Sequence, residues 1–388
     1  MNRKAIEKLK TIYNEMASSD KQRFSKYACS NEIAYRLNKE HREHLRLPFA
    51  IDRDRVLYSG AYRRYQGKTQ VFSFTNQIDE EMTNRSLHTT YVSQISRTIG
   101  KSLGLNLELI EAIALGHDLG HTPFGHDGEK ALNKICIKHG IGHFHHNIES
   151  LHIVDNISRK GRGLNLTFQV RDGIISHDGE THNTRLIPNR DKKEKDIQDF
   201  IVKKKIGENV RWMPATLEGC VVRATDTIAY IGQDIEDAIR FNILSRSELP
   251  EECVNYLGNR NSQIIDTLVK SVILNSYDND FIAFDEETSY YMKKLKDFNY
   301  DRIYTNDEVK KSNSIILRSM ENLFECYMND IEKSNKHSKI FTQFLNNKNE
   351  RYLEKYSPAE QVRDFIATMT DRYFNEEIKR NFLPGRFL

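Results

Sequence analysis

Apolar residues recur at helical spacing along most of this 388-residue chain, and this periodicity restricts its fold more than any other feature. Apolar side chains at positions 87, 91, 95, 99 and 103 predict a helix over 84–101 that ends before Gly104. A second helix is predicted after Asn106, leading to His117, and a third over about 216–241. Alternating, strand-like stretches are few, and there are only seven prolines. The sequence therefore predicts an all-α fold in which helices pack on helices.

The length suits one large domain with elaborations or two domains, and a hydrophobic content of 38% supports a substantial core. No repeat or low-complexity linker divides the chain. We expect the core at 1–245 and a helical C-terminal region at 246–388 that packs on it. A charged insertion at about 190–208 interrupts the helical pattern, with mixed charges over 190–196 and three lysines at 203–205. Charge at that density predicts a solvated loop.

Composition argues against several classes of protein. No apolar run approaches the ~18 residues of a transmembrane helix, and the first residues lack the apolar stretch of a secretory signal, so we expect a cytoplasmic protein without a membrane partner. The five cysteines include no Cys-x-x-Cys pair, which argues against a disulfide framework and a zinc–thiolate site. A net charge of +3 is nearly balanced and does not indicate a nucleic-acid-binding surface.

Residues 114–129 form a polar, glycine-rich run that is unusual in a helical chain. Its sixteen residues contain three histidines, three carboxylates and four glycines, a density for which an amphipathic helix has no structural need. Eight of the chain's fourteen histidines lie between positions 117 and 152. Because neutral imidazoles bind metals and exchange protons near neutral pH, this run predicts the centre of a metal-dependent phosphohydrolase.

Two histidines and two carboxylates are predicted to meet in the core. His88 shares a helix face with apolar residues at 92, 95 and 99, and His117 lies seven residues after Ile110, so both rings point inward. Asp118 adjoins His117, and Asp226 lies on the inward face of the third helix. A buried carboxylate is costly unless it is protonated, paired or metal-bound. The four residues therefore predict an octahedral site for a divalent metal, with positions left for water and phosphate oxygens.

A single inward histidine or aspartate is more often a hydrogen-bonded core residue than a ligand, and a His-Asp dipeptide alone carries little information. The chain contains a second such dyad at 177–178, for which no matching upstream histidine helix is evident, and we expect it in a loop near the phosphate tail of a ligand. The dyad at 117–118 differs because His121, His126 and Glu129 follow it, and nothing structural demands them.

Six motifs, in order along the chain, resemble one family; they lie at 63–72, 84–88, 116–129, 163–167, 228–230 and 369–373. The chain is similar to the HD-domain superfamily of metal phosphohydrolases, whose signature is H…HD…D, and within it to the deoxyguanosinetriphosphate triphosphohydrolase (dGTPase) group. This resemblance implies an HD-domain helical bundle elaborated by additional C-terminal helices. It also implies that a deoxynucleoside triphosphate, dGTP or a broader range of dNTPs, is split between the 5′ oxygen and the α-phosphorus into a deoxynucleoside and inorganic tripolyphosphate.

The resemblance also implies roles for individual residues. It implies that the metal ligands of this chain are His88, His117, Asp118 and Asp226. It also implies that the ion is Mn²⁺ or Mg²⁺, with Fe²⁺ or Co²⁺ as further candidates. The departing 5′ oxygen needs a proton, for which His126 is the first candidate, with Glu129 one helical turn away to orient it, and His146 is the second. His121 serves either role or braces the site.

Substrate contacts follow from the same resemblance. Gln70 and Val71 match family positions that approach the sugar and base. Tyr230 and Asp234 lie four and eight positions beyond Asp226 on one helical face. The nearby cations for the triphosphate are Arg64, Lys68 and Arg85. A tyrosine ring against C2′ would exclude a 2′-hydroxyl and favour deoxyribose.

The chain departs from the family pattern at two positions beyond the last expected ligand. Thr227 stands where many members have a second aspartate, and Gln233 stands where many have histidine. Both changes affect substrate range or regulation rather than the four ligands. By resemblance we expect a homo-oligomer, hexameric or otherwise, with an activator nucleotide at subunit boundaries as a further candidate partner.

Two other functions stay open at this point. One is a different HD phosphohydrolase, acting on a nucleoside monophosphate, a cyclic nucleotide or an alarmone. The other is a nucleotide-sensing regulator or a nucleic-acid-binding module whose metal site is structural or inactive. His126 and Glu129 argue against an inactive site, and the balanced charge argues against the nucleic-acid module.

Overall fold

The computed structural model describes residues 3–40, 46–70, 83–179, 185–306 and 313–383. Within these ranges the chain consists of helices and their connections, and its β-contacts are isolated bridges, which confirms the predicted all-α class. None of these helices combines the length and apolarity needed to cross a bilayer. The α-helices are α1 Arg3–Arg23, α2 Pro48–Leu57, α3 Gly60–Arg64, α4 Arg85–Ser102, α5 Leu107–Gly116, α6 Gly125–Lys138, α7 His146–His152, α8 Ser158–Gly161, α9 Phe168–Ile175, α10 Glu194–Lys205, α11 Leu217–Ile231, α12 Gln233–Arg240, α13 Glu251–Leu257, α14 Asn261–Ser276, α15 Glu286–Asn299, α17 Asn313–Glu332, α18 Glu350–Lys355, α19 Pro358–Ala367 and α20 Asp371–Phe382.

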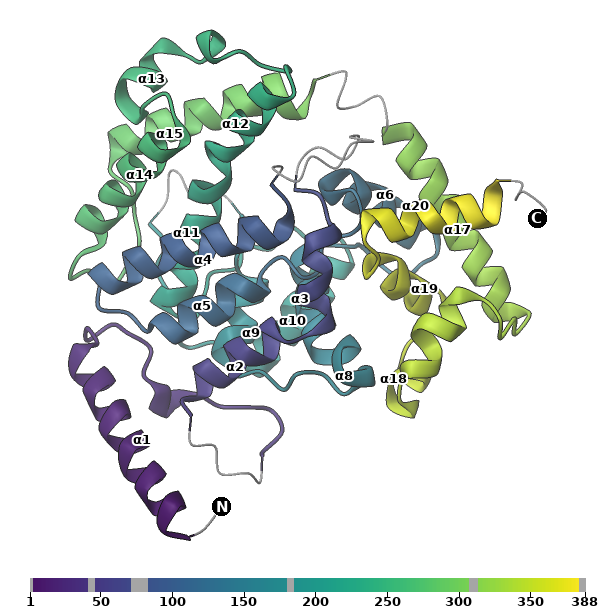
Figure 1. Cartoon of the computed structure of the whole chain (residues 1–388), viewed down its shortest axis with the longest axis horizontal. Coiled ribbons are helices and arrows are strands. Elements are labelled where there is room, and N and C mark those ends of the chain that lie inside the picture. The colour runs from purple at the N-terminus through teal and green to yellow at the C-terminus, as the bar shows by residue number, and fades with distance from the viewer. Residues whose placement is uncertain (1–2, 41–45, 71–82, 180–184, 307–312, 384–388) are drawn as a thin grey trace.

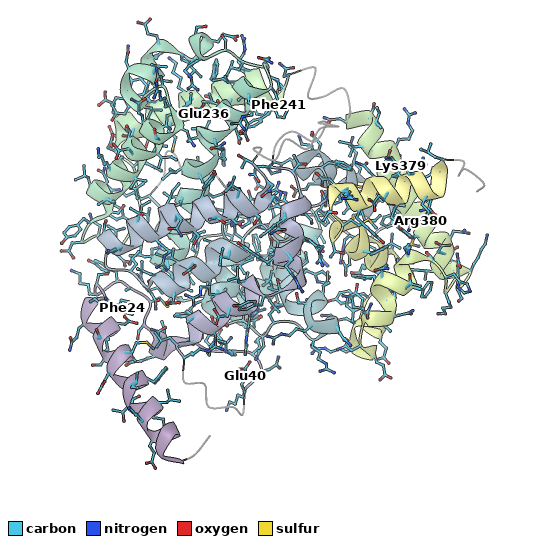
Figure 2. The ribbon with its side chains drawn as sticks, viewed as in Figure 1. Phe24, Glu40, Glu236, Phe241, Lys379 and Arg380 are labelled. Carbon is cyan, nitrogen blue, oxygen red and sulfur yellow. The ribbon has the colours of Figure 1, made fainter. Side chains whose placement is uncertain are left out.

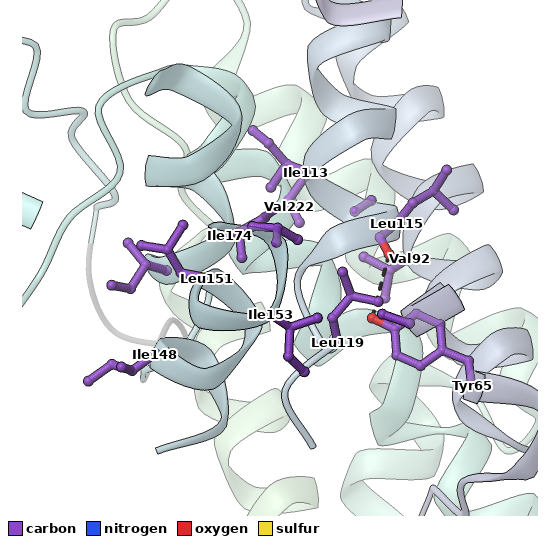
Figure 3. Packing of buried hydrophobic residues seen from close by; sticks show 14 of the residues in the cluster. Tyr65, Val92, Ile113, Leu115, Leu119, Ile148, Leu151, Ile153, Ile174 and Val222 are labelled. Atoms are coloured by element: carbon purple, nitrogen blue, oxygen red, sulfur yellow. Dashed lines mark hydrogen bonds between the residues drawn. The ribbon is translucent and has the colours of Figure 1, made fainter. Parts of the chain in front are cut away.

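Helix α5 lies at the centre of the core. Every residue from 109 to 116 except Glu111 is buried, so the helix is apolar on nearly all sides and must be covered on nearly all sides. Helices α2, α4, α9 and α11 pack against it. Figure 3 shows Ile113 of α5 beside Ile174 of α9 and Val222 of α11. The same packing determines the position of His117 and Asp118, which directly follow the last residue of α5.

The first two helices predicted from periodicity are confirmed. Asn84 precedes α4 and Asn106 precedes α5, and each side chain accepts a hydrogen bond from a backbone N–H in the first turn of its helix. The third predicted helix is interrupted, which corrects the expectation of one continuous element. It divides into α11 and α12 at Gly232, a weak helix former whose missing Cβ leaves room for Asn261.

The helices beyond position 245 gather in two groups on the core (Figure 1). Helix α13 packs on α14 and α15, which both contact α11, whereas α17 and α19 pack on α6 and α17 also contacts α20. In Figure 2, Glu236 and Phe241 mark the side of the first group, and Lys379 and Arg380 mark the side of the second. The division of the chain near residue 245 stays a prediction.

The charged insertion expected to be a solvated loop is in large part a helix. Residues Glu194–Lys205 form α10, which buries Ile197 and Phe200. Two apolar residues three positions apart are enough to give a mostly charged helix an inward face, and composition alone does not reveal this. Lys192 is also buried, and its ammonium donates hydrogen bonds to the carboxylate of Asp172 and to a backbone carbonyl.

Candidate metal centre

Three helices bring the four predicted ligand residues together. Helix α4 contributes His88 from near its start and α11 contributes Asp226, while His117 and Asp118 follow directly after the last residue of α5. Because α4 and α11 both pack on α5, these side chains converge at one end of the three-helix packing.

The donor atoms of the four side chains face one another. His88 Nε2 lies 3.0 Å from Asp226 Oδ1 and 3.9 Å from Asp118 Oδ2. His117 Nε2 lies 3.4 Å from Asp118 Oδ1 and 3.6 Å from Asp226 Oδ1. Both imidazoles therefore contact both carboxylates. His88, His117 and Asp118 are buried, and Asp226 is partly exposed.

The chemistry of this donor set fits a divalent cation. His117 Nδ1 lies 2.7 Å from the carbonyl oxygen of Ala114, so this nitrogen carries a proton and donates it. His117 Nε2 is buried and has no hydrogen-bond partner within the described ranges. In the neutral ring the Nε2 lone pair faces two carboxylate oxygens, and a proton or a metal ion between these atoms relieves the repulsion. Burial lowers the pKa of His117, but the carboxylates of Asp118 and Asp226 outweigh burial and raise it to about 8.

Arg85 is a fifth charged group of the centre. One terminal nitrogen of its guanidinium donates to Asp118 Oδ2 over 2.6 Å. Its Nε and its other terminal nitrogen are buried without a hydrogen-bond partner in the described part of the chain. Burial raises the pKa of Asp118, but His117, His121 and Arg85 together hold it well below its usual range. The guanidinium thus offsets the charge of the Asp118 carboxylate and keeps donors for an anion.

A second cluster surrounds the carboxylate of Glu129. His126 precedes Glu129 by one turn of α6, and its Nδ1 lies 3.2 Å from Glu129 Oε2. His146, the first residue of α7, lies with Nδ1 3.0 Å from Glu129 Oε1 and donates its backbone N–H to that oxygen over 2.8 Å. The His121 ring stacks on that of His146 with centroids 4.1 Å apart, and its Nε2 lies 3.2 Å from Asp118 Oδ1. His121 therefore connects the second cluster to the metal centre.

The histidines of this second cluster have different electrostatic surroundings. Burial lowers the pKa of His146, but Glu129 outweighs burial and raises it to about 9. Burial and the nearby charges of Arg85 and His146 hold the pKa of His121 well below its usual value, so His121 is neutral. The side chain of His126 is 67% exposed and can meet a ligand in solution.

His177 contacts the candidate metal centre, which the sequence did not predict, although its dyad was expected in a loop near a ligand. It is buried in the loop after α9, lines the cavity, and its ring centroid lies 4.8 Å from that of His117. Its Nε2 lies 3.1 Å from His146 Nε2 and 3.7 Å from Asp118 Oδ1. A weak signal was present in the sequence, because Ile174 and Ile175 at the end of α9 precede His177 much as the apolar end of α5 precedes His117.

A cavity of about 660 Å³ joins the two clusters. Four of the predicted substrate contacts line it: Gln70, Arg85, Tyr230 and Asp234. Asp234 is buried, its Oδ2 accepts a hydrogen bond from the Tyr304 hydroxyl, and its Oδ1 has no partner among the described residues. Burial raises the pKa of Asp234 to about 7.

Two of the other three predicted contacts, Arg64 and Lys68, do not line this cavity. Arg64 lines a separate cavity of about 910 Å³. Lys68 is buried, and its ammonium donates to the carbonyl oxygens of His121 and Ala367. Val71 lies outside the described residues. The helix and turn geometry around Lys68 thus directs its charge to backbone groups rather than to a ligand.

The sequence of this chain matches two known protein domains and a set of known proteins. Residues 85–230 match the HD domain, and residues 282–380 match the phosphohydrolase-associated domain. The chain is 36% identical over 362 residues to the deoxyguanosinetriphosphate triphosphohydrolase-like protein of Caldanaerobacter subterraneus subsp. tengcongensis, with 93% of each chain covered. The chain belongs to the deoxyguanosinetriphosphate triphosphohydrolase-like family.

Other members of the dGTPase-like family match over a similar extent. The Clostridium tetani protein is 35% identical over 349 residues, covering 89% of this chain and 88% of its own. The Desulfatibacillum aliphaticivorans protein is 36% identical over 344 residues, covering 88% and 89%. Because HD domains bind divalent metals, and the His/Asp cluster described above is able to hold one, these matches identify the chain as an HD-type phosphohydrolase.

Proposed function

We propose that this protein is a metal-dependent dNTP triphosphohydrolase that converts dGTP, or a broader range of dNTPs, to a deoxynucleoside and inorganic tripolyphosphate. The observation that supports this most is that the His/Asp cluster and the cluster around Glu129 share one cavity. Its volume of about 660 Å³ suits a nucleotide-sized ligand. The dGTPase-like names of its relatives point to the same class of substrate.

The proposed metal ligands are His88, His117, Asp118 and Asp226, and the proposed ion is Mn²⁺ or Mg²⁺, with Fe²⁺ or Co²⁺ as further candidates. When bound, such an ion supplies Lewis-acid polarisation of a phosphate ester and activation of a water nucleophile at neutral pH. The chain itself binds and orients the substrate. Arg85 contributes its remaining buried donors to a phosphate oxygen beside Asp118.

We assign protonation of the departing 5′ oxygen to His126. Glu129 contacts Nδ1 of both His126 and His146, so each ring has only Nε2 left for another partner. In His146 this atom is already 3.1 Å from His177 Nε2. His126 is exposed at the cavity, where its Nε2 can face the substrate oxygen. His146 holds Glu129 in place and is the second candidate for the acid, while His121 braces both clusters.

The sugar and base are assigned to the far side of the same cavity. The buried Oδ1 of Asp234 and the buried Oε1 of Gln70 both lack a hydrogen-bond partner within the described ranges. Each is therefore an acceptor for a hydroxyl or amino group of the ligand. Tyr230 lies one turn beyond Asp226 on α11, where its ring can cover C2′ of the deoxyribose.

A product assay tests the proposal. The protein is incubated with Mn²⁺ or Mg²⁺ and each dNTP, and anion-exchange chromatography resolves nucleoside, mono- and diphosphate, and tripolyphosphate. The expected result is deoxynucleoside with tripolyphosphate, formed much more slowly by His126→Ala, not formed by Asp226→Ala, and formed normally by His337→Ala, a variant of an exposed histidine elsewhere. Monophosphate or diphosphate would move the cleaved bond and overturn the proposal.

Assembly into a homo-oligomer with an activator nucleotide is tested with the same assay. Turnover that requires a mixture of dNTPs, together with a nucleotide-dependent change in mass by light scattering, is the expected result for an activated oligomer. Turnover of each dNTP alone by a monomer would contradict that expectation while leaving the chemistry intact.

A further inference from the structure

The junction of α19 and α20, at 367–371, contacts two segments beside the proposed catalytic cavity, one at Phe124 and one at Thr69. The Asp371 carboxylate accepts hydrogen bonds from both segments. Its Oδ1 accepts from the backbone N–H of Phe124 over 3.0 Å. Its Oδ2 accepts from the backbone N–H of Thr69 over 3.1 Å and also from the Thr69 hydroxyl. Phe124 stands two residues before His126, and Thr69 stands directly before Gln70.

The backbone at Phe124 needs such support. Phe124 has φ +64°, in the left-handed region that non-glycine residues rarely adopt. Conformations of this kind persist where their surroundings determine them. Here the surroundings come from α20, because Asp371 binds the backbone of Phe124 and the Phe374 ring packs edge-on against the Phe124 ring with centroids 5.1 Å apart. The turn that starts α6, and with it His126, is thus held from the C-terminal region.

The same turn packs directly against Arg85 and Gln70, two of the proposed substrate-binding residues. Gly125 has φ +55°, and a Cβ at this position would come within 3.3 Å of both a terminal nitrogen of Arg85 and the carbonyl oxygen of Gln70. A movement of this turn would therefore change the position of His126 relative to both residues. Glycine permits this close approach and the positive φ together.

A second tie joins the same segments. The buried ammonium of Lys68 donates to the carbonyl oxygens of His121 and Ala367, the latter over 2.8 Å. A Cβ at Gly67 would meet the Thr370 side chain at 2.8 Å, so the segment before Gln70 packs tightly on the segment before Asp371.

We propose that Asp371 is a positioning residue whose carboxylate holds the turn carrying His126 and the segment carrying Gln70 in one fixed relation across the cavity. The inference rests on the proposed function for the role of His126. It assigns the C-terminal region a part in completing the catalytic cavity. The substitution Asp371→Asn puts an NH₂ group in place of one carboxylate oxygen, and because NH₂ cannot accept a hydrogen bond, one of the two segments would lose its acceptor.

A double-mutant cycle distinguishes positioning from a general structural role. In the wild-type background, Asp371→Asn is expected to lower kcat by about 10- to 100-fold, since small misplacements of a catalytic group have effects of that order. In the His126→Ala background the same substitution is expected to cause little further loss of kcat, because the group it positions is gone. Equal fold-losses in both backgrounds would overturn the proposal.

A measurement independent of activity accompanies the cycle. In protein labelled with ¹³C-histidine, the His126 signal is assigned by its absence from His126→Ala, and Asp371→Asn is expected to move it. Asp285→Asn is the matched control, because Asp285 also accepts hydrogen bonds from a backbone N–H and from hydroxyls, three in this case, but lies directly before α15. A moved signal without dNTP hydrolysis by the wild type would overturn the proposed function alone, and an unmoved signal would overturn the positioning role.

A milder variant keeps the test decisive if Asp371→Asn fails to fold. Thr69→Val removes only the hydroxyl donor to Asp371 and leaves the backbone hydrogen bond in place. It is expected to lower kcat by about 5-fold, the equivalent of one ordinary hydrogen bond, again with no further loss in the His126→Ala background. A loss of the same size in both backgrounds would count against positioning.

Discussion

Removing the Asp226 carboxylate is expected to remove most of the stabilisation of the fold by divalent metal. Asp226 Oδ1 is the oxygen shared by both imidazoles of the proposed centre, 3.0 Å from His88 Nε2 and 3.6 Å from His117 Nε2. Asp226→Asn keeps the shape of the side chain but removes one of the two negative charges that the imidazoles face. An amide is a much weaker ligand for a divalent ion than a carboxylate, so the metal affinity should fall by about 100-fold or more.

The size of the effect follows from binding to the native state. An ion at 100 times its Kd stabilises a protein by about 2.7 kcal/mol. For 388 residues, an unfolding entropy of about 2.1 cal/mol/K per residue gives about 0.8 kcal/mol/K, so the Tm should rise by about 3 °C. In Asp226→Asn the same ion concentration would be near the weakened Kd, and the remaining stabilisation of about 0.4 kcal/mol corresponds to about 0.5 °C.

Thermal unfolding of EDTA-treated protein during a Mn²⁺ titration, with calorimetric titration of the same samples, measures this effect. Asp178→Asn is the matched control, because Asp178 belongs to the other His-Asp dyad and lines the same cavity but is not among the four ligands. The control should keep the full rise in Tm. A full rise in Asp226→Asn, or none in the wild type, would refute the assignment of the centre.

Three further predictions address the proton donor, the fold and the sugar contact. His126→Ala should lower kcat by about 10²- to 10⁴-fold and His146→Ala by less, and steady-state kinetics showing the reverse order would exchange their roles. Lys192→Met leaves the buried carboxylate of Asp172 without its ammonium partner and should lower the free energy of unfolding in urea by about 3–5 kcal/mol. The control Lys195→Met, at an exposed position, should change that free energy by no more than about 0.5 kcal/mol. Equal effects would contradict the buried pair. Burial raises the pKa of Asp234 to about 7, so the group ionises and accepts hydrogen bonds better as the pH rises through 7. KM for the dNTP should therefore fall across that range in the wild type but not in Asp234→Asn, and parallel pH profiles would contradict the contact.

The residues that periodicity places correctly are those on long, apolar-faced helices. His88 follows the face of α4, and His117 follows the apolar sequence of α5, so the inward direction of both rings could be read from spacing. Asp226 could be placed in the same way on α11 even though the helix was expected to continue past Gly232. Helical spacing contains this information because each position determines the direction of its side chain.

Contacts between distant segments could not be read in this way. Lys68 was expected at the triphosphate because it is a cation in a recognised motif, but its carbonyl partner Ala367 lies 299 positions away. Thr69 and Asp371 are 302 positions apart. Nothing in the local pattern of either segment indicates the other. The contact between His177 and His146 was not predicted for a related reason, since His177 follows α9, His146 begins α7, and the two rings meet only through tertiary packing.

The charge of the cavity leads to a last prediction, that nucleotide binding itself depends on metal. In the described part of the chain, six carboxyl groups and four cationic side chains line the cavity, and His146, whose pKa is raised to about 9, is a fifth cation near neutral pH. A nucleoside triphosphate adds about four negative charges. A divalent ion would offset part of the negative charge that the triphosphate brings beside these carboxylates, and one charge pair at about 4 Å contributes about 4 kcal/mol at an effective dielectric constant of 20. Binding of dGTP to His126→Ala, measured calorimetrically, should therefore weaken by about 100-fold or more when EDTA replaces Mn²⁺. Binding of deoxyguanosine, which lacks phosphates, should change little, and equal dGTP affinity in both conditions would show that the protein's own cations suffice to hold the triphosphate.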